Sequence, residues 1–206
     1  MLDWYFPIEA GQRALDVGCG SGVIAHAMAQ KGAQVLAVDG NPDAIRYATM
    51  TFGSDALEFR QGLVDELNLP ENTFDRITCL EVIEHIHEDQ GRTLLQSLYR
   101  LLKPGGKLLL TTPNYRGTWP IIEWVADHVR LTAHMESDQH VMHYYRSSLR
   151  KVIEASGFEV DAIRTMSTVS PFVAALGFGA ARAIESVERK VDLPFGNLLA
   201  AVCSKP

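Results

Sequence analysis

The sequence predicts a three-layer α/β fold, in which helices cover both faces of a mainly parallel sheet. Short apolar runs rich in β-branched residues alternate with longer segments of helical periodicity. These runs are apolar on both faces, as is typical of strands that lie between two layers of helices. A chain that alternates strands and helices in this way forms right-handed crossovers between parallel strands.

The first part of the chain supplies four predicted strands and two predicted helices. The strands are expected at 13–17, 33–39, 56–62 and 74–80. One helix is expected over 23–31, directly after a glycine-rich turn. The second is expected in "NPDAIRYATMTF", because Asn41 is a suitable N-cap and Pro42 a suitable first helical residue.

The second part continues the pattern around one interruption. A helix is expected over 88–102, where "KPGG" ends it. A strand at 107–113, a helix at 147–157 and strands at 158–166 and 197–204 are expected after it. The segment at about 114–146 breaks the rhythm and is interpreted as an insertion or lid. An amphipathic helix is expected at about 171–191. We interpret residues 1–206 as a single domain.

Composition excludes several classes of protein. The chain is 47% hydrophobic and 21% charged, with a formal net charge of −6, so it lacks a global basic field for nucleic acid. No apolar run reaches the roughly 18 residues that a membrane span needs. The three cysteines form no Cys-x-x-Cys pair, and the first residues do not resemble a signal peptide. A cytoplasmic protein with reduced thiols is therefore expected.

The stretch "LDVGCGSG" places Gly18, Gly20 and Gly22 between a strand and a helix. Glycines there allow a ligand to approach the backbone closely. Asp39 ends the second strand, where an acid can accept the hydroxyls of an adenosine ribose. Asp16 precedes the glycines, and its carboxylate suits an amine-bearing ligand better than a pyrophosphate.

These motifs together resemble the class I S-adenosylmethionine-dependent methyltransferases. The matching stretches are "LDVGCGSG", "VDGNPDAI", "GLVDELNLPENTFD", "FDRITCLEVIEHI" and "LLKPGGKLLLTTPN". "HVMHYYRSSLRKVIEASGFEV" and "NLLAAVCSKP" extend the resemblance over nearly the whole chain. It implies a Rossmann-like sandwich with a seven-stranded sheet and one antiparallel strand near the C-terminus. It also implies S-adenosylmethionine as cofactor and S-adenosylhomocysteine as product.

The resemblance assigns roles to residues at the ends of the strands. Asp39 would accept the ribose hydroxyls, Leu63 and Val64 would lie by the adenine, and Leu80 and Glu81 would lie by the sulfonium. The usual side-chain contact to the adenine amine is missing at Leu63, so the backbone there or Asp65 would replace it. The full set of implied cofactor-binding residues is Asp16, Gly18, Cys19, Gly20, Gly22, Asp39, Gly40, Asn41, Leu63, Val64, Leu80 and Glu81.

The stretch "CLEVIEHIHEDQ" follows the fourth strand and carries the candidate chemistry. Glu81, Glu84 and His85 have the i, i+3, i+4 spacing of one helix face, which Glu88 would extend. Three interpretations stay open: a Mg²⁺ or Mn²⁺ site, a metal-free acid–base group, or a polar helix start. Two related subfamilies use a similar set with Mg²⁺, namely ubiquinone-biosynthesis O-methyltransferases and small-RNA 2′-O-methyltransferases. His140 is the candidate for the further histidine of the second subfamily.

The function predicted from these motifs is methyl transfer to a hydroxyl of a small or lipid-linked acceptor, such as a quinone precursor, a phenol or a sugar. The candidate catalytic residues are His85, Glu84 and His140. RNA 2′-O-methylation is one alternative, although nucleic acid is disfavoured by the acidic chain; Arg116, Arg130, Arg146 and Arg150 are its possible local patch. A cofactor-binding protein without turnover is another. A peripheral membrane contact is compatible with the helix at 171–191, and no pattern indicates an oligomeric state.

Overall fold

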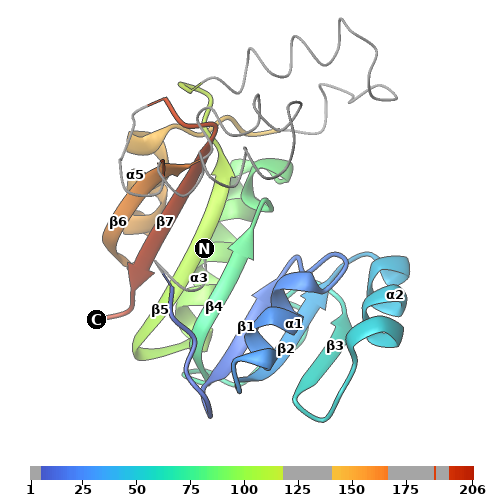
Figure 1. Cartoon of the computed structure of the whole chain (residues 1–206). Helices are drawn as coiled ribbons and strands as arrows, with labels where there is room; N and C mark the ends of the chain where they lie inside the picture. The colour runs from blue at the N-terminus through green and yellow to red at the C-terminus, as the bar shows by residue number, and fades with distance from the viewer. Residues whose placement is uncertain (1–5, 118–140, 167–187, 189–194) are drawn as a thin grey trace, which may run out of the picture.

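The computed structural model describes residues 6–117, 141–166, 188 and 195–206, and a seven-stranded sheet runs through its centre (Figure 1). The strand order is β3-β2-β1-β4-β5-β7-β6. Only β7 runs antiparallel to its neighbours, β5 and β6. The strands are β1 (Arg13–Val17), β2 (Gln34–Asp39), β3 (Leu57–Gln61), β4 (Phe74–Leu80), β5 (Leu102–Pro113), β6 (Glu159–Met166) and β7 (Leu198–Ser204). The predicted mostly parallel sheet with one antiparallel strand near the C-terminus is confirmed.

Helices cover both faces of this sheet, as predicted. Figure 1 shows α1 (Val23–Gln30) on one face and α3 (Glu88–Leu101) and α5 (Arg146–Ala155) on the other. The helix α2 (Pro42–Phe52) shares a hydrophobic cluster with α1 and with the N-terminal residues Phe6 and Ile8. The second, larger cluster lies between the sheet and the helices α3 and α5. The chain therefore has an apolar core on each side of the sheet.

The helix α2 begins where the sequence predicted. The Asn41 side chain accepts hydrogen bonds from the backbone N–H groups of Asp43 at 2.9 Å and Ala44 at 3.3 Å, and Pro42 is the first helical residue. These bonds satisfy donors that the first helical turn leaves unpaired. The cap fixes the direction of the chain as it leaves β2, directly after Asp39.

The start of β5 differs from the prediction. The "KPGG" sequence was expected to be a turn before a strand at 107–113, but β5 begins at Leu102 and includes it. Pairing with β4 is irregular between Phe74 and Arg76, so the extended chain follows β4 through a break in register. Gly105 donates its N–H to the Lys205 carbonyl at 2.8 Å, a contact that joins this segment to the C-terminal residues.

Lys205 makes a polar contact that ties the end of β7 to the end of α3. Its ammonium donates to Asn72 Oδ1 at 2.8 Å and to the carbonyls of Tyr99 and Leu102 at 2.9 Å each. The ammonium also lies 4.7 Å from the Tyr99 ring centroid. A cation at this position satisfies carbonyls that the last helical turn leaves unpaired and interacts favourably with the helix dipole.

We expect Lys205→Met to lower the free energy of unfolding by about 1–3 kcal/mol, because it removes charge-assisted hydrogen bonds and keeps the apolar stem. Urea denaturation monitored by circular dichroism measures this change. Lys151→Met on the exposed face of α5 is the matched control, and its effect should stay within about 0.5 kcal/mol. Equal stability of Lys205→Met and the control would contradict a stabilising role for the ammonium.

Several predicted features fall outside the described residues. They are most of the insertion expected at 114–146, including His140, and all of the helix expected at 171–191 except residue 188. Within the described ranges, none of the helices has both the length and the apolar character that a bilayer crossing requires.

Candidate functional site

The glycine-rich loop after β1 is packed closely against the loop after β4. Gly18 has φ +69°, and a Cβ atom there would collide with Cγ2 of Val82. Its N–H donates to the Val38 carbonyl at 2.9 Å, which holds the loop against β2. At Gly22, φ is +82° and a Cβ would lie 2.8 Å from the Phe59 ring. Glycine is therefore required at both positions by conformation and by space.

Asp39 at the end of β2 organises the same loop. Its Oδ2 accepts a hydrogen bond from the Gly20 N–H at 2.9 Å, and its Oδ1 accepts one from the Asn41 N–H at 2.8 Å. A carboxylate has about four lone-pair sites, so each oxygen can accept a further bond from a ligand hydroxyl. The side chain is therefore held in place by the backbone and can still accept hydrogen bonds.

A cavity of about 430 Å³ lies beside this loop, a volume typical of small-molecule sites. Its lining follows the ends of β3, β2, β1 and β4, so the cavity spans four strands that are neighbours in the sheet. It is lined by Val17, Gly18, Val38, Asp39, Gly40, Gly62, Leu63, Val64, Asp65, Glu81, Val82, His85, Ile86, Asp89, Gln90, Thr93 and Leu94. The structure thus brings together Gly18, Asp39, Gly40, Leu63, Val64, Glu81 and His85 from the predicted set.

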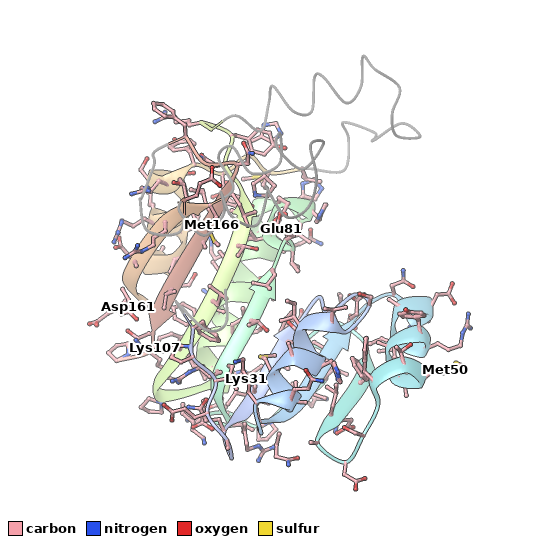
Figure 2. All side chains as sticks on the ribbon, viewed as in Figure 1. Lys31, Met50, Glu81, Lys107, Asp161 and Met166 are labelled. Atoms are coloured by element: carbon pink, nitrogen blue, oxygen red, sulfur yellow. The ribbon has the colours of Figure 1, made fainter. Side chains whose placement is uncertain are left out.

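Glu81 lies at the end of β4, where Figure 2 labels it. Its φ of +55° is left-handed, and its N–H donates to the Thr111 carbonyl at 3.2 Å. The Thr111 hydroxyl in turn donates to Glu81 Oε1 at 2.6 Å. Burial of the carboxyl group, and then the charge of Glu84, raise the pKa of Glu81 to about 7.

Glu84 is fully buried just beyond Glu81. Its Oε2 accepts a hydrogen bond from the Thr112 hydroxyl at 3.1 Å, whereas its Oε1 is buried without a hydrogen-bond partner. Burial raises the pKa of Glu84 to about 7. The half-exposed His85 lies nearby, with 4.0 Å between its Nε2 and Glu84 Oε1. A carboxyl group that titrates near neutral pH thus has an imidazole as its neighbour at the cavity wall.

The prediction that Glu81, Glu84, His85 and Glu88 share one helix face is wrong. Glu81 precedes the helical turn, a short 3-10 helix η1 covers Ile83–His85, and the chain is extended at Ile86 before α3 begins at Glu88. The reason is a tertiary contact, because the Glu81 N–H bonds to β5 and leaves the chain in a left-handed conformation.

The proposed metal ligands do not form a metal-binding cluster in the described part of the chain. No group of three or more His, Cys, Asp or Glu side chains is placed there to hold a metal ion. The carboxylates of Glu81 and Glu84 are instead bound separately by the hydroxyls of Thr111 and Thr112. The predicted Mg²⁺ site at Glu81, Glu84 and His85 therefore lacks support from the residues that the structure describes.

The raised pKa of Glu84 has a consequence for stability. Its pKa rises from an ordinary value of 4.5 to about 7, so the folded chain binds this proton more tightly than the unfolded chain. Folding therefore takes up a proton between these values, and the contribution of Glu84 to stability falls as pH rises through this range. Below about pH 4.5 both states are protonated and the penalty is absent.

We expect Glu84→Gln to be more stable than the unmodified chain at pH 8, by at most about 3 kcal/mol, since the amide cannot ionise. The difference should nearly vanish at pH 4.5. Urea denaturation in EDTA at both pH values measures it, with the exposed Glu66→Gln as control. A variant that kept the pH dependence of the unmodified chain would show that Glu84 does not titrate near neutral pH.

Six of the predicted cofactor-binding residues do not line the cavity. Asp16 is buried beneath the loop, where its Oδ1 accepts from the Thr78 hydroxyl at 2.6 Å and burial raises its pKa to about 7. Burial also raises the pKa of the Cys19 thiol to about 12, which disfavours the nucleophilic thiolate. Leu80 packs in the core cluster of α1. Gly20, Gly22 and Asn41 shape the loop and the α2 cap.

One wall of the cavity was missed by sequence reasoning. Asp89, Gln90, Thr93 and Leu94 come from α3, for which the sequence predicted a helix but no role in the site. Residues 89, 90 and 93 are polar and precede the leucines of this helix, and polar residues of an amphipathic helix are normally solvent-exposed. The sequence feature that could have indicated this wall is the short separation along the chain between these polar residues and the "EVIEH" motif.

Comparisons with known proteins address the family of the chain. A family model described as "Methyltransferase domain" matches residues 2–163. The mitochondrial ubiquinone biosynthesis O-methyltransferase of Schizosaccharomyces pombe is 43% identical over 108 residues, which is 50% of this chain and 38% of that protein. The ubiquinone biosynthesis O-methyltransferase of Xanthomonas oryzae pv. oryzae is 40% identical over 108 residues, which is 51% of this chain and 44% of that protein.

The match therefore covers less than half the length of these two curated relatives. A solved structure, a SAM dependent methyltransferase from Archaeoglobus fulgidus, superposes with a TM-score of 0.72. The superposition covers 99% of this chain and 91% of the other, at 19% identity, so it supports the fold alone.

Proposed function

The chain belongs to the methyltransferase domain family, and from this premise we propose that it transfers a methyl group from S-adenosylmethionine to a hydroxyl group of a small or lipid-linked acceptor. One observation carries the proposal: Gly18 and Asp39 line the same cavity as Glu81 and His85. The named relatives are O-methyltransferases of ubiquinone biosynthesis, which favours a phenolic or quinone-precursor acceptor.

The residues of the cavity fit S-adenosylmethionine. Asp39 would accept the ribose hydroxyls through the lone pairs that its two backbone hydrogen bonds leave available. Gly18 would let the amino-acid portion of the ligand approach the loop, and Leu63 and Val64 would pack against the adenine. Asp16 does not line the cavity; it is buried and its hydrogen bond from the Thr78 hydroxyl joins the end of β1 to β4 beneath the loop.

The chemical step needs little from the protein beyond positioning and removal of one proton. S-adenosylmethionine, when bound, would supply an already activated methyl group; transfer would exchange its C–S bond for a C–O bond to the acceptor and leave S-adenosylhomocysteine. We infer that His85 takes the hydroxyl proton as general base. The nearby Glu84 carboxylate would stabilise the imidazolium that forms. Thr112 holds Glu84 in place for this role.

The proposal is tested by mixing the full chain with S-adenosylmethionine and catechol, with aniline as the amine counterpart. Formation of S-adenosylhomocysteine and O-methylated catechol, followed by mass spectrometry, is the expected result. Tight binding of S-adenosylmethionine without turnover on hydroxyl acceptors would favour a cofactor-binding protein instead. Methylation of aniline alone would contradict the hydroxyl assignment.

A Mg²⁺-dependent form of the reaction would need a ligand from outside the described residues, and His140 is the candidate that the sequence offers. The role of His85 argued from the described residues predicts that turnover continues in excess EDTA. Loss of turnover in EDTA that Mg²⁺ restores would overturn the metal-free assignment.

A further inference from the structure

A second pocket lies on the same edge of the sheet as the cavity and is lined by arginines. Its volume is about 350 Å³, and its lining residues are Asn114, Arg116, Tyr145, Arg146, Ser147, Arg150 and Thr165. Three of these seven side chains are cationic, and no acidic residue belongs to the lining that the structure describes. The whole chain has a net charge of −6, so this local excess of positive charge runs against its overall composition.

The sheet register places this pocket beside the proposed methyl-transfer site. Thr112, which binds Glu84, and Thr165, which lines the pocket, both pair with Leu199 on β7. They are therefore two strand spacings apart, or about 10 Å. Figure 2 shows Glu81, which follows β4, and Met166, which ends β6, at the same end of the sheet. The strands β5 and β7 lie between β4 and β6. The pocket and the cavity share no lining residue.

Buried and stacked groups hold the pocket in shape. The Asn114 side chain is buried, donates to the Gly196 carbonyl at 2.8 Å, and accepts the Arg116 N–H at 3.2 Å. The Arg116 guanidinium lies 4.0 Å from the Tyr145 ring centroid, within cation–π distance. This contact fixes the plane of the guanidinium, which is the group best suited to bind oxyanions in two-point contact.

The first turn of α5 adds to the positive potential. Tyr145 is the N-cap of this helix, and Arg146 and Ser147 follow as its first residues. Exposed N–H groups and the helix dipole favour an anion at such a helix start. Among the arginines, Arg150 pairs with Glu154 at 3.1 Å, with both side chains about half exposed. An exposed pair of this kind contributes little and is easily exchanged for a better anionic partner.

We propose that this arginine pocket, formed by Arg116, Arg146 and Arg150 with Asn114 and the start of α5, binds a phosphate or a similar oxyanion of a small molecule. Thr165 in its lining lies about 10 Å from Thr112, which binds Glu84 next to His85, so we assign the anion to the methyl acceptor, a step that rests on the proposed function. A concave pocket with one stacked aromatic residue fits a single anionic group better than the extended basic stripe that RNA would need.

The test is a titration of the full chain with inorganic phosphate at pH 7 and constant ionic strength, followed by ¹H–¹⁵N NMR spectroscopy. We expect saturable shifts of the Arg116, Arg146 and Ser147 amides, with a Kd in the low millimolar range. The double variant Arg116→Gln, Arg150→Gln should bind phosphate at least about five-fold more weakly. The control Arg46→Gln removes the same charge from α2, where its side chain is 72% exposed, and should bind like the unmodified chain.

Shifts that do not saturate, that chloride reproduces, or that survive in the double variant would overturn the proposal. Two further arms separate the sources of the anion. Binding of phosphatidylglycerol vesicles, but not phosphatidylcholine vesicles, through the same arginines and without competition from phosphate would overturn the small-molecule assignment. Binding of a 20-nucleotide single-stranded RNA through the same arginines, without competition from phosphate, would also overturn it and would indicate RNA as the ligand.

The two proposals can fail separately. Binding of S-adenosylmethionine, measured by calorimetry, should be unaffected by phosphate and by the double variant, because the two pockets share no residue. If the chain does not bind phosphate but still binds the cofactor and turns over, only the proposal that the arginine pocket binds an anion is overturned. If the chain does not bind the cofactor, the proposed function is overturned, and the phosphate titration still tests the arginine pocket.

Discussion

Replacing His85 with alanine is expected to lower kcat for methylation of a hydroxyl acceptor by about 100- to 1000-fold, the usual contribution of a positioned general base. His85 lines the cavity, and its imidazole has the buried Glu84 carboxyl group 4.0 Å away. Alanine removes the proton acceptor and leaves Asp39 and the glycine loop intact. The affinity for S-adenosylmethionine should therefore change far less than kcat.

Steady-state kinetics with the acceptor, and calorimetry with S-adenosylhomocysteine, measure the two effects of His85→Ala separately. The matched control is His87→Ala, because His87 is two residues away, is exposed, and is absent from the cavity lining. Its kcat should stay within about two-fold of the unmodified chain. If the His85→Ala variant kept full kcat, another group or solvent would be the acceptor of the hydroxyl proton, and His85 would not be the general base.

Replacing Asp39 with alanine is expected to weaken binding of S-adenosylhomocysteine by about 100-fold. Hydrogen bonds to a charged group contribute roughly 1.5–3 kcal/mol each, and 100-fold corresponds to about 2.7 kcal/mol. The substitution also frees the Gly20 and Asn41 N–H groups, whose hydrogen bonds Asp39 accepts. Some loss of stability should therefore accompany the loss of affinity.

Calorimetry gives the affinity of the Asp39→Ala variant, and thermal unfolding gives its stability. Asp39→Asn is the informative second variant, since it keeps one acceptor oxygen and should show a smaller loss. Asp43→Ala on α2, where the side chain is 75% exposed, controls for the removal of one surface carboxylate. Unchanged affinity in Asp39→Ala would rule out its role as the ribose acceptor.

The sequence predicted the strands near the site almost to the residue. β1 and β4 match their expected ranges, because each is a short apolar run with a polar or glycine-rich stretch at its end. The start of α2 was also predictable, since Asn41 and Pro42 determine it by local contacts alone. Local signals of this kind are sufficient to place Asp39 and Gly18 at one edge of the sheet.

The acid–histidine stretch shows where such reasoning fails. The i, i+3, i+4 spacing of Glu81, Glu84 and His85 is compatible with a helix, but the N–H of Glu81 bonds to β5, thirty residues later in the chain. That partner cannot be read from local periodicity. The contribution of α3 to the cavity was missed for a related reason, because the way its polar side meets the loop after β4 depends on packing between distant segments.

The position of β7 has a consequence for how the site is assembled. This strand, Leu198–Ser204, lies inside the sheet between β5 and β6, although it follows both of them in the sequence. Thr111 and Thr112, which bind the two glutamates, both pair with β7 residues. Pairing of distant segments is slow because a long loop must close first. The pairing of β5 with β7 therefore closes a long loop, and Thr111 and Thr112 acquire this support from a segment more than 80 residues later in the sequence.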